Sequence, residues 1–405
     1  MQIEAVLLKA KYRLLLLLVL FGGFLFSPEV KGNRESAVSQ LPDYWPTHGW
    51  QFSPPELQGM NPTVFLQMHD FIEAGNFPLE ALLVVRNGYL VYEHYPSSFY
   101  DVNDLHIIYS CTKSVTSALI GIAVQYGYLA SINERVVDLF SDRTIANLDA
   151  RKQAMTVEHL LTMTAGFEWD DDVNFWSMQG SGNWVQYVLD RPMSADPGSE
   201  WVYNSGASHL LSAIVDENSI TGTITFAEMN LFAPLGITDY VWMTDDQDVP
   251  FGGSSLFLRP RDMAKLGFLY LQNGNWAGEQ IIPELWITAS STTHVTLGGG
   301  TGYGYQWWTT EQLGSFEARG YAGQFIIVIP EEEMVIVFTA SDLGFEVPTG
   351  TLIYDYILAA IQGPPGGISP GLFPWPLLLG VGVIITGSVV VGIGVWFLRR
   401  RRQAI

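Results

Sequence analysis

The stretch Ile107-Ile108-Tyr109-Ser110-Cys111-Thr112-Lys113-Ser114-Val115 leads into a largely apolar run over residues 116–124. A helix over these residues places Ser110 and Lys113 on one face, one turn apart. The first turn of a helix also offers backbone N–H groups that have no partner within the helix. The stretch therefore predicts a hydroxyl nucleophile beside an amine base, at a position where an oxyanion would be stabilised.

The chemistry of lysine supports this pairing. The chain has few lysines, and Lys113 is the one that falls inside an apolar helical run. Burial disfavours the ammonium form, so a buried Lys113 would have a lowered pKa and could accept the proton of Ser110 near neutral pH. The alternative for so short a motif is a helix N-cap serine with a lysine that extends outward to solvent, and the motif alone does not decide between them.

The hydrophobic pattern around this helix predicts an α+β fold. Residues 81–95 form two β-rich runs around Asn87-Gly88, which is a strong hairpin signal. Further strands are expected at 305–308, 324–329 and 334–339, and helices at 208–215 and 264–272. This order predicts one antiparallel sheet that is built from both ends of the chain and flanked by helices, with a mainly helical region inserted.

The composition excludes several classes of function. A net charge of -21 makes the chain unsuited to binding nucleic acid, which needs a basic face. Cys111 is the sole cysteine, so no intrachain disulfide can form, and we expect it to pack as a small hydrophobic side chain. No two of the 7 histidines have the spacing H-x-x-x-H, so we expect neither a metal nor a cofactor.

Both ends of the chain carry long apolar runs. Residues 1–26 have positive charges followed by an apolar stretch, which is typical of a signal peptide or an uncleaved N-terminal anchor. Residues 363–371 are typical of a Gly/Pro linker, 372–398 of a transmembrane helix, and 399–405 of a basic cytoplasmic tail. We therefore expect residues 27–362 to form an extracytoplasmic domain, tethered to the lipid bilayer by a single C-terminal helix.

Three short stretches occur in an order that is typical of one family. They are Ser110-Cys111-Thr112-Lys113, Tyr203-Asn204-Ser205 and Tyr321-Ala322-Gly323, the last in the place of a Lys-Thr-Gly or His-x-Gly motif on the edge of a strand. Over residues 45–362 the chain resembles the class C serine β-lactamases and their relatives, which are penicillin-recognising D,D-peptidases, esterases and 6-aminohexanoate-dimer hydrolases. The resemblance implies a β-lactamase/transpeptidase-like fold.

The resemblance also implies catalytic roles. Ser110 would attack the substrate carbonyl, while Lys113 and Tyr203 would activate it and carry protons to the leaving group and from water. Either of these two groups could be the base, since they titrate as a coupled set. Ser205 would orient Lys113 or the substrate amide. The backbone N–H groups of Ser110 and Gln324 would form the oxyanion hole.

The third motif departs from the family pattern. Tyr321 replaces the usual lysine or histidine, so the cation that would pair with a β-lactam carboxylate is missing, and Tyr321 either lines the pocket or packs. A side chain at Gly323 would block the approach of the carbonyl to the strand edge. The departure favours small esters or amides over penicillins as substrates.

We therefore expect a serine hydrolase that acts on a small ester, amide or peptide through an acyl-enzyme. The alternatives are β-lactamase or D,D-carboxypeptidase activity, or a surface module that has the fold without turnover. The acidic run Asp170-Asp171-Asp172 is expected to be a solvated loop. The oligomeric state stays open.

Overall fold

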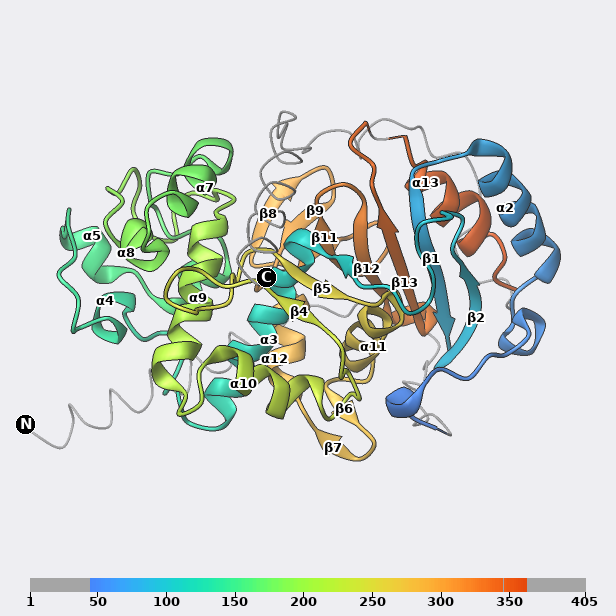
Figure 1. Ribbon diagram of the computed structural model, residues 1–405, viewed down its shortest axis with the longest axis horizontal. Helices are drawn as coiled ribbons and strands as arrows, with labels where there is room; N and C mark the ends of the chain where they lie inside the picture. The colour runs from blue at the N-terminus through green and yellow to red at the C-terminus, as the bar shows by residue number, and fades with distance from the viewer. Residues whose placement is uncertain (1–43, 345, 363–405) are drawn as a thin grey trace, which may run out of the picture. The chain divides into compact units, whose positions relative to one another are not determined.

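The computed structural model describes residues 44–344 and 346–362 (Figure 1). Its main element is an 8-stranded antiparallel sheet in the order β2-β1-β13-β12-β11-β10-β9-β8. The strands are β1 (Leu79–Arg86), β2 (Tyr89–His94), β8 (Val295–Gly298), β9 (Thr301–Tyr303), β10 (Trp308–Thr310), β11 (Ser315–Gly320), β12 (Gln324–Ile329) and β13 (Met334–Ala340). β1 pairs with β13, so the sheet is built from both ends of the chain, as the sequence predicts.

The first hairpin has the turn that its sequence demands. Asn87 and Gly88 connect β1 to β2, and their φ angles of 51° and 82° are both positive. Asn and Gly tolerate this left-handed conformation, and a turn with two such residues matches the twist of paired strands. The Asn-Gly signal is therefore confirmed.

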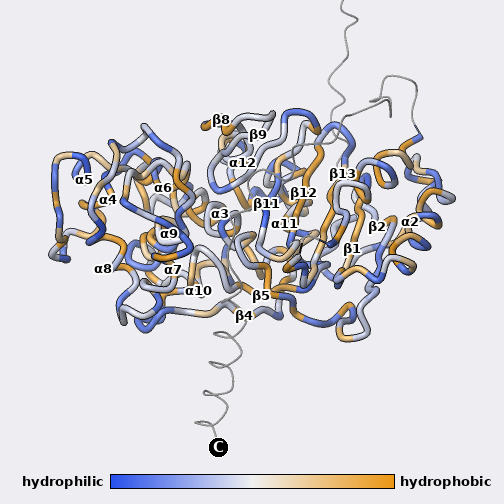
Figure 2. The backbone as a smooth tube through the Cα atoms, turned by 90° about the horizontal axis from the view of Figure 1, so that it is seen from above, coloured by the Kyte–Doolittle hydropathy of each residue, from blue (hydrophilic) through white to orange (hydrophobic). Residues whose placement is uncertain are grey.

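The central strands of the sheet are buried on both faces. In β1, Leu83 and Val85 face a core shared with α3 (Thr112–Gln125) and α11 (Pro260–Leu271). The alternate residues Leu82 and Val84 face a second core shared with α2 (Pro62–Gly75) and the π-helical segment Leu352–Leu358, which follows the short helix α13 (Thr349–Thr351). In Figure 2 much of the backbone along β1, β12 and β13 carries the colour of hydrophobic residues. A strand buried on both faces is apolar throughout, which explains the run Ala81-Leu82-Leu83-Val84-Val85.

The insertion between the two halves of the sheet is mainly helical, as expected. Its helices before α11 are α4 (Val136–Leu139), α5 (Ala150–Ala154), α6 (Val157–Leu161), α7 (Asp171–Gln179), α8 (Trp184–Leu189), α9 (Ser205–Asn218) and α10 (Thr223–Ala227), and α12 (Glu284–Ser291) follows α11. Short strands β3 (His106–Ile107), β5 (Leu256–Leu258) and β4 (Val241–Trp242) form a small sheet, and β6 (Asn275–Trp276) pairs with β7 (Glu279–Gln280). α9 packs against α3, so the insertion contacts the helix that follows Ser110.

One expected strand, at 305–308, is misplaced. Only Trp308 of this run lies in a strand, as the first residue of β10; residues 305–307 connect β9 to β10, and Gln306 has a φ of 62°. The polar groups of Gln306 form hydrogen bonds with helices and not with a neighbouring strand. Its N–H donates to Leu161 O at 3.1 Å and its carbonyl accepts from Ser114 Oγ at 2.7 Å. Its side-chain oxygen accepts from Ser208 Oγ at 2.7 Å. This connection ties α3, α6 and α9 together at the site described below.

The expected export signal (1–26), linker (363–371), membrane helix (372–398) and basic tail (399–405) all lie outside the described residues. Among the residues that the structure does describe, there is no helix of sufficient length and apolarity to span a bilayer.

Candidate active site

Ser110 lies in a strained turn between a strand and a helix. It is the middle residue of a 3-10 helix, Tyr109–Cys111, that joins β3 to α3. Tyr109 has a φ of 43°, a left-handed conformation that costs a non-glycine residue about 1 kcal/mol or more. The turn is held by Ile108, whose N–H donates to Leu256 O at 2.9 Å and whose carbonyl accepts from Cys111 N–H at 3.0 Å. The strain is thus offset by neighbouring contacts, and Ser110 stays half-exposed.

Lys113 is buried and touches Ser110. The side chain of Lys113 is among the largest that are fully enclosed, with 2% of the residue exposed. Its Nζ lies 3.1 Å from Ser110 Oγ, 3.0 Å from Ser205 Oγ and 2.7 Å from the Gly253 carbonyl oxygen. Burial lowers the pKa of Lys113 to about 8, against the opposing effect of the Asp171 carboxylate. This geometry favours the nucleophile-and-base interpretation over a lysine that extends into solvent.

Tyr203 lies against both Lys113 and Ser110, as the family motifs predict. Its ring lies 4.7 Å from Lys113 Nζ, measured to the ring centroid. Burial raises the pKa of Tyr203 far above its usual value, and a hydrogen bond with Ser110 offsets this only in part. Aromatic side chains surround it: Trp308 stacks on Tyr203 at 6.2 Å, and Trp201 lies 6.1 Å away. The phenol is therefore held in its neutral form, next to both Ser110 and Lys113.

Ser205 is positioned by an aspartate from another helix. Ser205 is the first residue of α9, and its Oγ donates to Asp171 Oδ2 at 2.8 Å. Its backbone N–H donates to Asp171 Oδ1 at 2.8 Å, and the same oxygen accepts from Trp169 Nε1 at 2.8 Å. A continuous chain of contacts therefore runs from Ser110 through Lys113 and Ser205 to Asp171.

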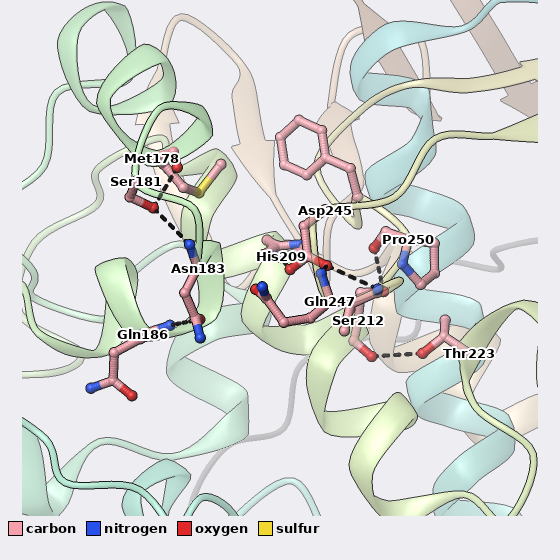
Figure 3. Close-up of polar contacts among 12 residues, drawn as sticks. Met178, Ser181, Asn183, Gln186, His209, Ser212, Thr223, Asp245, Gln247 and Pro250 are labelled. Atoms are coloured by element: carbon pink, nitrogen blue, oxygen red, sulfur yellow. Dashed lines mark hydrogen bonds and ion pairs between the residues drawn. The ribbon is translucent and has the colours of Figure 1, made fainter. Parts of the chain in front are cut away.

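The Gly253 carbonyl, the third hydrogen-bond partner of Lys113 Nζ, lies in a loop that is hydrogen-bonded to α9. Figure 3 shows His209 on α9 against Asp245, where the His209 Nε2 to Asp245 Oδ2 distance is 3.1 Å and both side chains are fully buried. One turn further on, Ser212 Oγ donates to the Pro250 carbonyl at 2.7 Å. A Cβ at Gly253 would lie 2.7 Å from Ser205 O, so only glycine lets this loop approach the start of α9.

The third motif lies in a hairpin turn rather than on a strand edge. Tyr321, Ala322 and Gly323 connect β11 to β12, and Ala322 and Gly323 have φ angles of 60° and 89°. A Cβ at Gly323 would also lie 3.0 Å from the Cβ of Ala340. Backbone conformation and this close approach therefore give two reasons for the glycine besides the room that it was expected to leave for a substrate carbonyl.

Gln324 opens β12 beside the Ser110 turn. Cys111 Sγ donates to the Gln324 carbonyl at 3.5 Å, so the backbone of Gln324 lies next to the residue that follows Ser110. The Gln324 side chain is buried and donates to the Ala340 carbonyl at 2.5 Å. Tyr321 forms an edge-to-face pair with Tyr109 at 5.5 Å. The structure thus gathers all seven expected site residues around the start of α3: Ser110, Lys113, Tyr203, Ser205, Tyr321, Gly323 and Gln324.

Sequence reasoning missed Asp171. It assigned the run 170–172 to a solvated loop, but Asp171 and Asp172 form the first residues of α7. Asp172 is exposed to solvent as expected, whereas Asp171 is partly buried and bonded to Ser205. Asp170 accepts from Asp172 N–H at 3.0 Å and caps α7. The contact of Asp171 with Ser205 spans 34 residues, and nothing in a run of three acids distinguishes the member that would make it.

One group of metal-ligating side chains converges among the described residues. His69 and Glu73 lie on α2, one helical turn apart, and His94 lies on β2, with candidate ligand atoms within 4.8 Å of one another. The histidine spacing H-x-x-x-H does not predict this group, because residue 73 is a glutamate and the third side chain comes from a different element. α2 packs on the opposite face of the sheet from α3, so the group is separate from Ser110.

Comparisons with known proteins agree with this fold. The model of the Beta-lactamase family matches residues 68–360. The 6-aminohexanoate-dimer hydrolase of Paenarthrobacter ureafaciens is 23% identical over 284 residues, which cover 65% of this chain and 72% of that protein. A penicillin-binding protein from Bacillus halodurans has a TM-score of 0.55 and 18% identity, covering 68% of this chain and 95% of its own. A family VIII carboxylesterase has a TM-score of 0.58 and 13% identity, covering 72% and 93%.

The family model covers both halves of the sheet, the inserted helices and all three motifs. This chain therefore belongs to the beta-lactamase family, which includes serine hydrolases such as esterases and amidases.

Proposed function

We propose that this protein is a serine hydrolase that cleaves a small ester or amide through an acyl-enzyme on Ser110. The observation that carries the proposal is the 3.1 Å contact between Ser110 Oγ and Lys113 Nζ, made by an amine that is buried and has a lowered pKa. A nucleophile within hydrogen-bond reach of a base is the arrangement that covalent catalysis requires. In the alternative, a binding module that has lost turnover, mutations would be expected to have disrupted this arrangement.

The base in this mechanism is Lys113. Its pKa of about 8 lies near neutral pH, whereas the pKa of Tyr203 is raised by burial, so the tyrosinate is the less accessible form. Neutral Lys113 takes the proton of Ser110 as Oγ attacks the carbonyl. Tyr203, which touches both groups, relays that proton to the leaving alcohol or amine, and the same groups activate water for deacylation.

The oxyanion of the tetrahedral intermediate would be stabilised by backbone N–H groups. Ser110 N–H precedes the first turn of α3, and Gln324 N–H opens β12 beside it. Preorganised donors of this kind contribute on the order of 3 kcal/mol each to the transition state.

The rate of acylation is expected to rise with pH. A lysine accepts a proton only in its neutral form, so with a pKa of about 8 only about a tenth of the molecules can react at one pH unit lower. We expect kcat/KM for p-nitrophenyl acetate to rise from about pH 6 and to level off above about pH 8.5, with the Ser110→Ala variant measured in parallel as the background. A flat profile over this range would contradict Lys113 as the base.

The substrate class follows from the charges near the third motif. Tyr321 supplies no cation, and the nearby Arg319 of β11 donates to Glu317 Oε2 at 2.7 Å and to Thr310 Oγ1 at 3.0 Å. An arginine committed to a buried carboxylate is a poor partner for the carboxylate of a β-lactam. The names of the relatives, a 6-aminohexanoate-dimer hydrolase and a carboxylesterase, support amide or ester substrates.

A comparison of chromogenic substrates tests this preference. We expect kcat/KM for p-nitrophenyl acetate to exceed that for nitrocefin by at least about 100-fold, because a missing ion pair of this kind costs about 3 kcal/mol. Rapid nitrocefin turnover would overturn the argument from Tyr321 and favour β-lactamase activity. Release of D-alanine from a D-alanyl-D-alanine peptide would favour the D,D-carboxypeptidase alternative.

Membrane attachment and an extracytoplasmic location stay predictions. They depend on the apolar residues 372–398 and the arginines that follow them, which lie outside the described residues. Protease added to intact cells is expected to remove the hydrolase domain and to spare the basic tail. Protection of the domain would reverse the predicted topology.

A further inference from the structure

The Asp171 carboxylate fixes the direction of the hydrogen bonds that reach Lys113. Asp171 Oδ2 has one hydrogen-bond partner among the described residues, Ser205 Oγ at 2.8 Å, and an ionised carboxylate can only accept. The single hydroxyl proton of Ser205 therefore points to Asp171. Toward Lys113 Nζ, which lies 3.0 Å away, Ser205 Oγ can then act only as an acceptor.

The second neighbour of Lys113 is also an obligate acceptor. The Gly253 carbonyl oxygen lies 2.7 Å from Nζ and carries no proton. A neutral amine has two N–H donors and one lone pair. When both donors serve Ser205 and Gly253, the lone pair is left for the third neighbour, Ser110 Oγ at 3.1 Å. This is the direction in which a base must face its nucleophile.

We propose that Asp171 is a positioning residue, which obliges Ser205 to accept from Lys113 and thereby directs the amine lone pair at Ser110. The proposal rests on the proposed function and adds to it a residue that does not touch the reacting atoms. In each turnover the Ser110 proton moves to Nζ, the Oγ–carbonyl bond forms, and Asp171 and Ser205 keep their protonation states throughout.

An asparagine separates this role from a merely structural one. Asp171 Oδ1 accepts from two fixed donors, Ser205 N–H and Trp169 Nε1–H, both at 2.8 Å. In Asp171→Asn the amide oxygen keeps these two contacts, so the amide nitrogen faces Ser205 Oγ and donates to it. The hydroxyl proton of Ser205 is then released and competes with Ser110 for the lone pair of Lys113, while the shape of the site is preserved.

The matched control is Asp172→Asn. Asp172 is the next residue of α7 and is exposed, so its substitution removes the same charge without touching the network. Among the described residues, the titratable and charged groups that face Lys113 are Asp171, Tyr203 and Cys111. The control thus separates the loss of a nearby negative charge in general from the loss of the Asp171 contact.

Two readouts test the proposal. For Asp171→Asn we expect the plateau of kcat/KM above about pH 8.5 to fall about 10- to 100-fold, while the midpoint of the pH profile moves down, because the Asp171 charge no longer raises the pKa of Lys113. We expect neither change in Asp172→Asn. A purely structural role would lower the folded fraction without moving the midpoint, and that outcome would overturn the proposal.

A measurement without turnover keeps the inference independent of the proposed function. The chain has six lysines, Lys9, Lys11, Lys31, Lys113, Lys152 and Lys265, so the NMR spectrum of protein with ¹³Cε-labelled lysine is simple. The Lys113 resonance, assigned by its loss in Lys113→Met, should titrate at lower pH in Asp171→Asn than in the wild type or in Asp172→Asn. Equal midpoints in all three proteins would refute the coupling. If the wild-type protein hydrolyses no substrate but the Lys113 midpoint is still lower in Asp171→Asn, only the proposed function is refuted.

Discussion

Replacing Ser110 by alanine is expected to lower kcat/KM for p-nitrophenyl acetate by at least about 10⁴-fold, because no acyl-enzyme can form without Oγ. Folding should be intact, since Ser110 lies half-exposed in its turn and alanine fits the same backbone. The measurement is steady-state hydrolysis by purified variant, together with urea unfolding to establish that the protein is folded.

The matched control for this substitution lies in α3, the helix that follows Ser110. Ser117 is fully buried in α3, and its Oγ has no hydrogen-bond partner among the described side chains and backbone. Ser117→Ala should therefore keep wild-type activity and stability. Retention of more than a few per cent of the activity by folded Ser110→Ala would show that the nucleophile has been assigned to the wrong residue.

Replacing Lys113 by methionine should lower kcat/KM by about 10²- to 10⁴-fold, which is the usual contribution of a positioned base. Methionine fills a similar volume without a proton acceptor of comparable strength. The substitution also leaves Ser205 Oγ and the Gly253 carbonyl without their shared donor, so the free energy of unfolding should fall by about 1–3 kcal/mol. Single-turnover acylation and chemical denaturation measure the two effects separately.

Lys152→Met is the control for the loss of a buried lysine. Lys152 is fully buried in α5 and donates to the carbonyls of Ala146 and Leu189 at 2.8 and 2.7 Å, among contacts separate from those of Ser110. It should lose stability by a similar amount and keep its activity at low temperature. Similar residual rates in Lys113→Met and Lys152→Met would argue that Lys113 is structural.

Local signals predicted β1, β2, β12 and β13, but not β8, β9 and β11 of the same sheet. The Asn87-Gly88 turn and the apolar runs of β1, β12 and β13 depend on neighbouring residues, and the structure confirms them. The connection around Gln306 could not be predicted in this way. Its sequence is rich in aromatic residues, as strands often are, but its polar groups bond to helices more than 90 residues away, including Ser208, which is 98 residues distant.

The site likewise has residues that local sequence signals predict and residues whose roles depend on contacts between distant parts of the chain. Ser110 and Lys113 share one helical face, so their contact follows from spacing alone, while the family motifs supplied Tyr203, Ser205 and the turn before Gln324. The roles of Asp171 and of the Gly253 carbonyl depend on contacts across 34 and 140 residues. A carboxylate in an acidic run and a backbone oxygen in a glycine pair carry no sequence signal for such roles.

The central claim is that Ser110 is the group that becomes acylated, and the most direct test is to locate a covalent label. Folded wild-type protein would be treated with a fluorophosphonate probe, digested and analysed by peptide mass spectrometry. We predict one probe per chain on Ser110, prevented by prior unfolding and absent from Ser110→Ala. A label on another side chain, or none on the folded protein, would contradict the account.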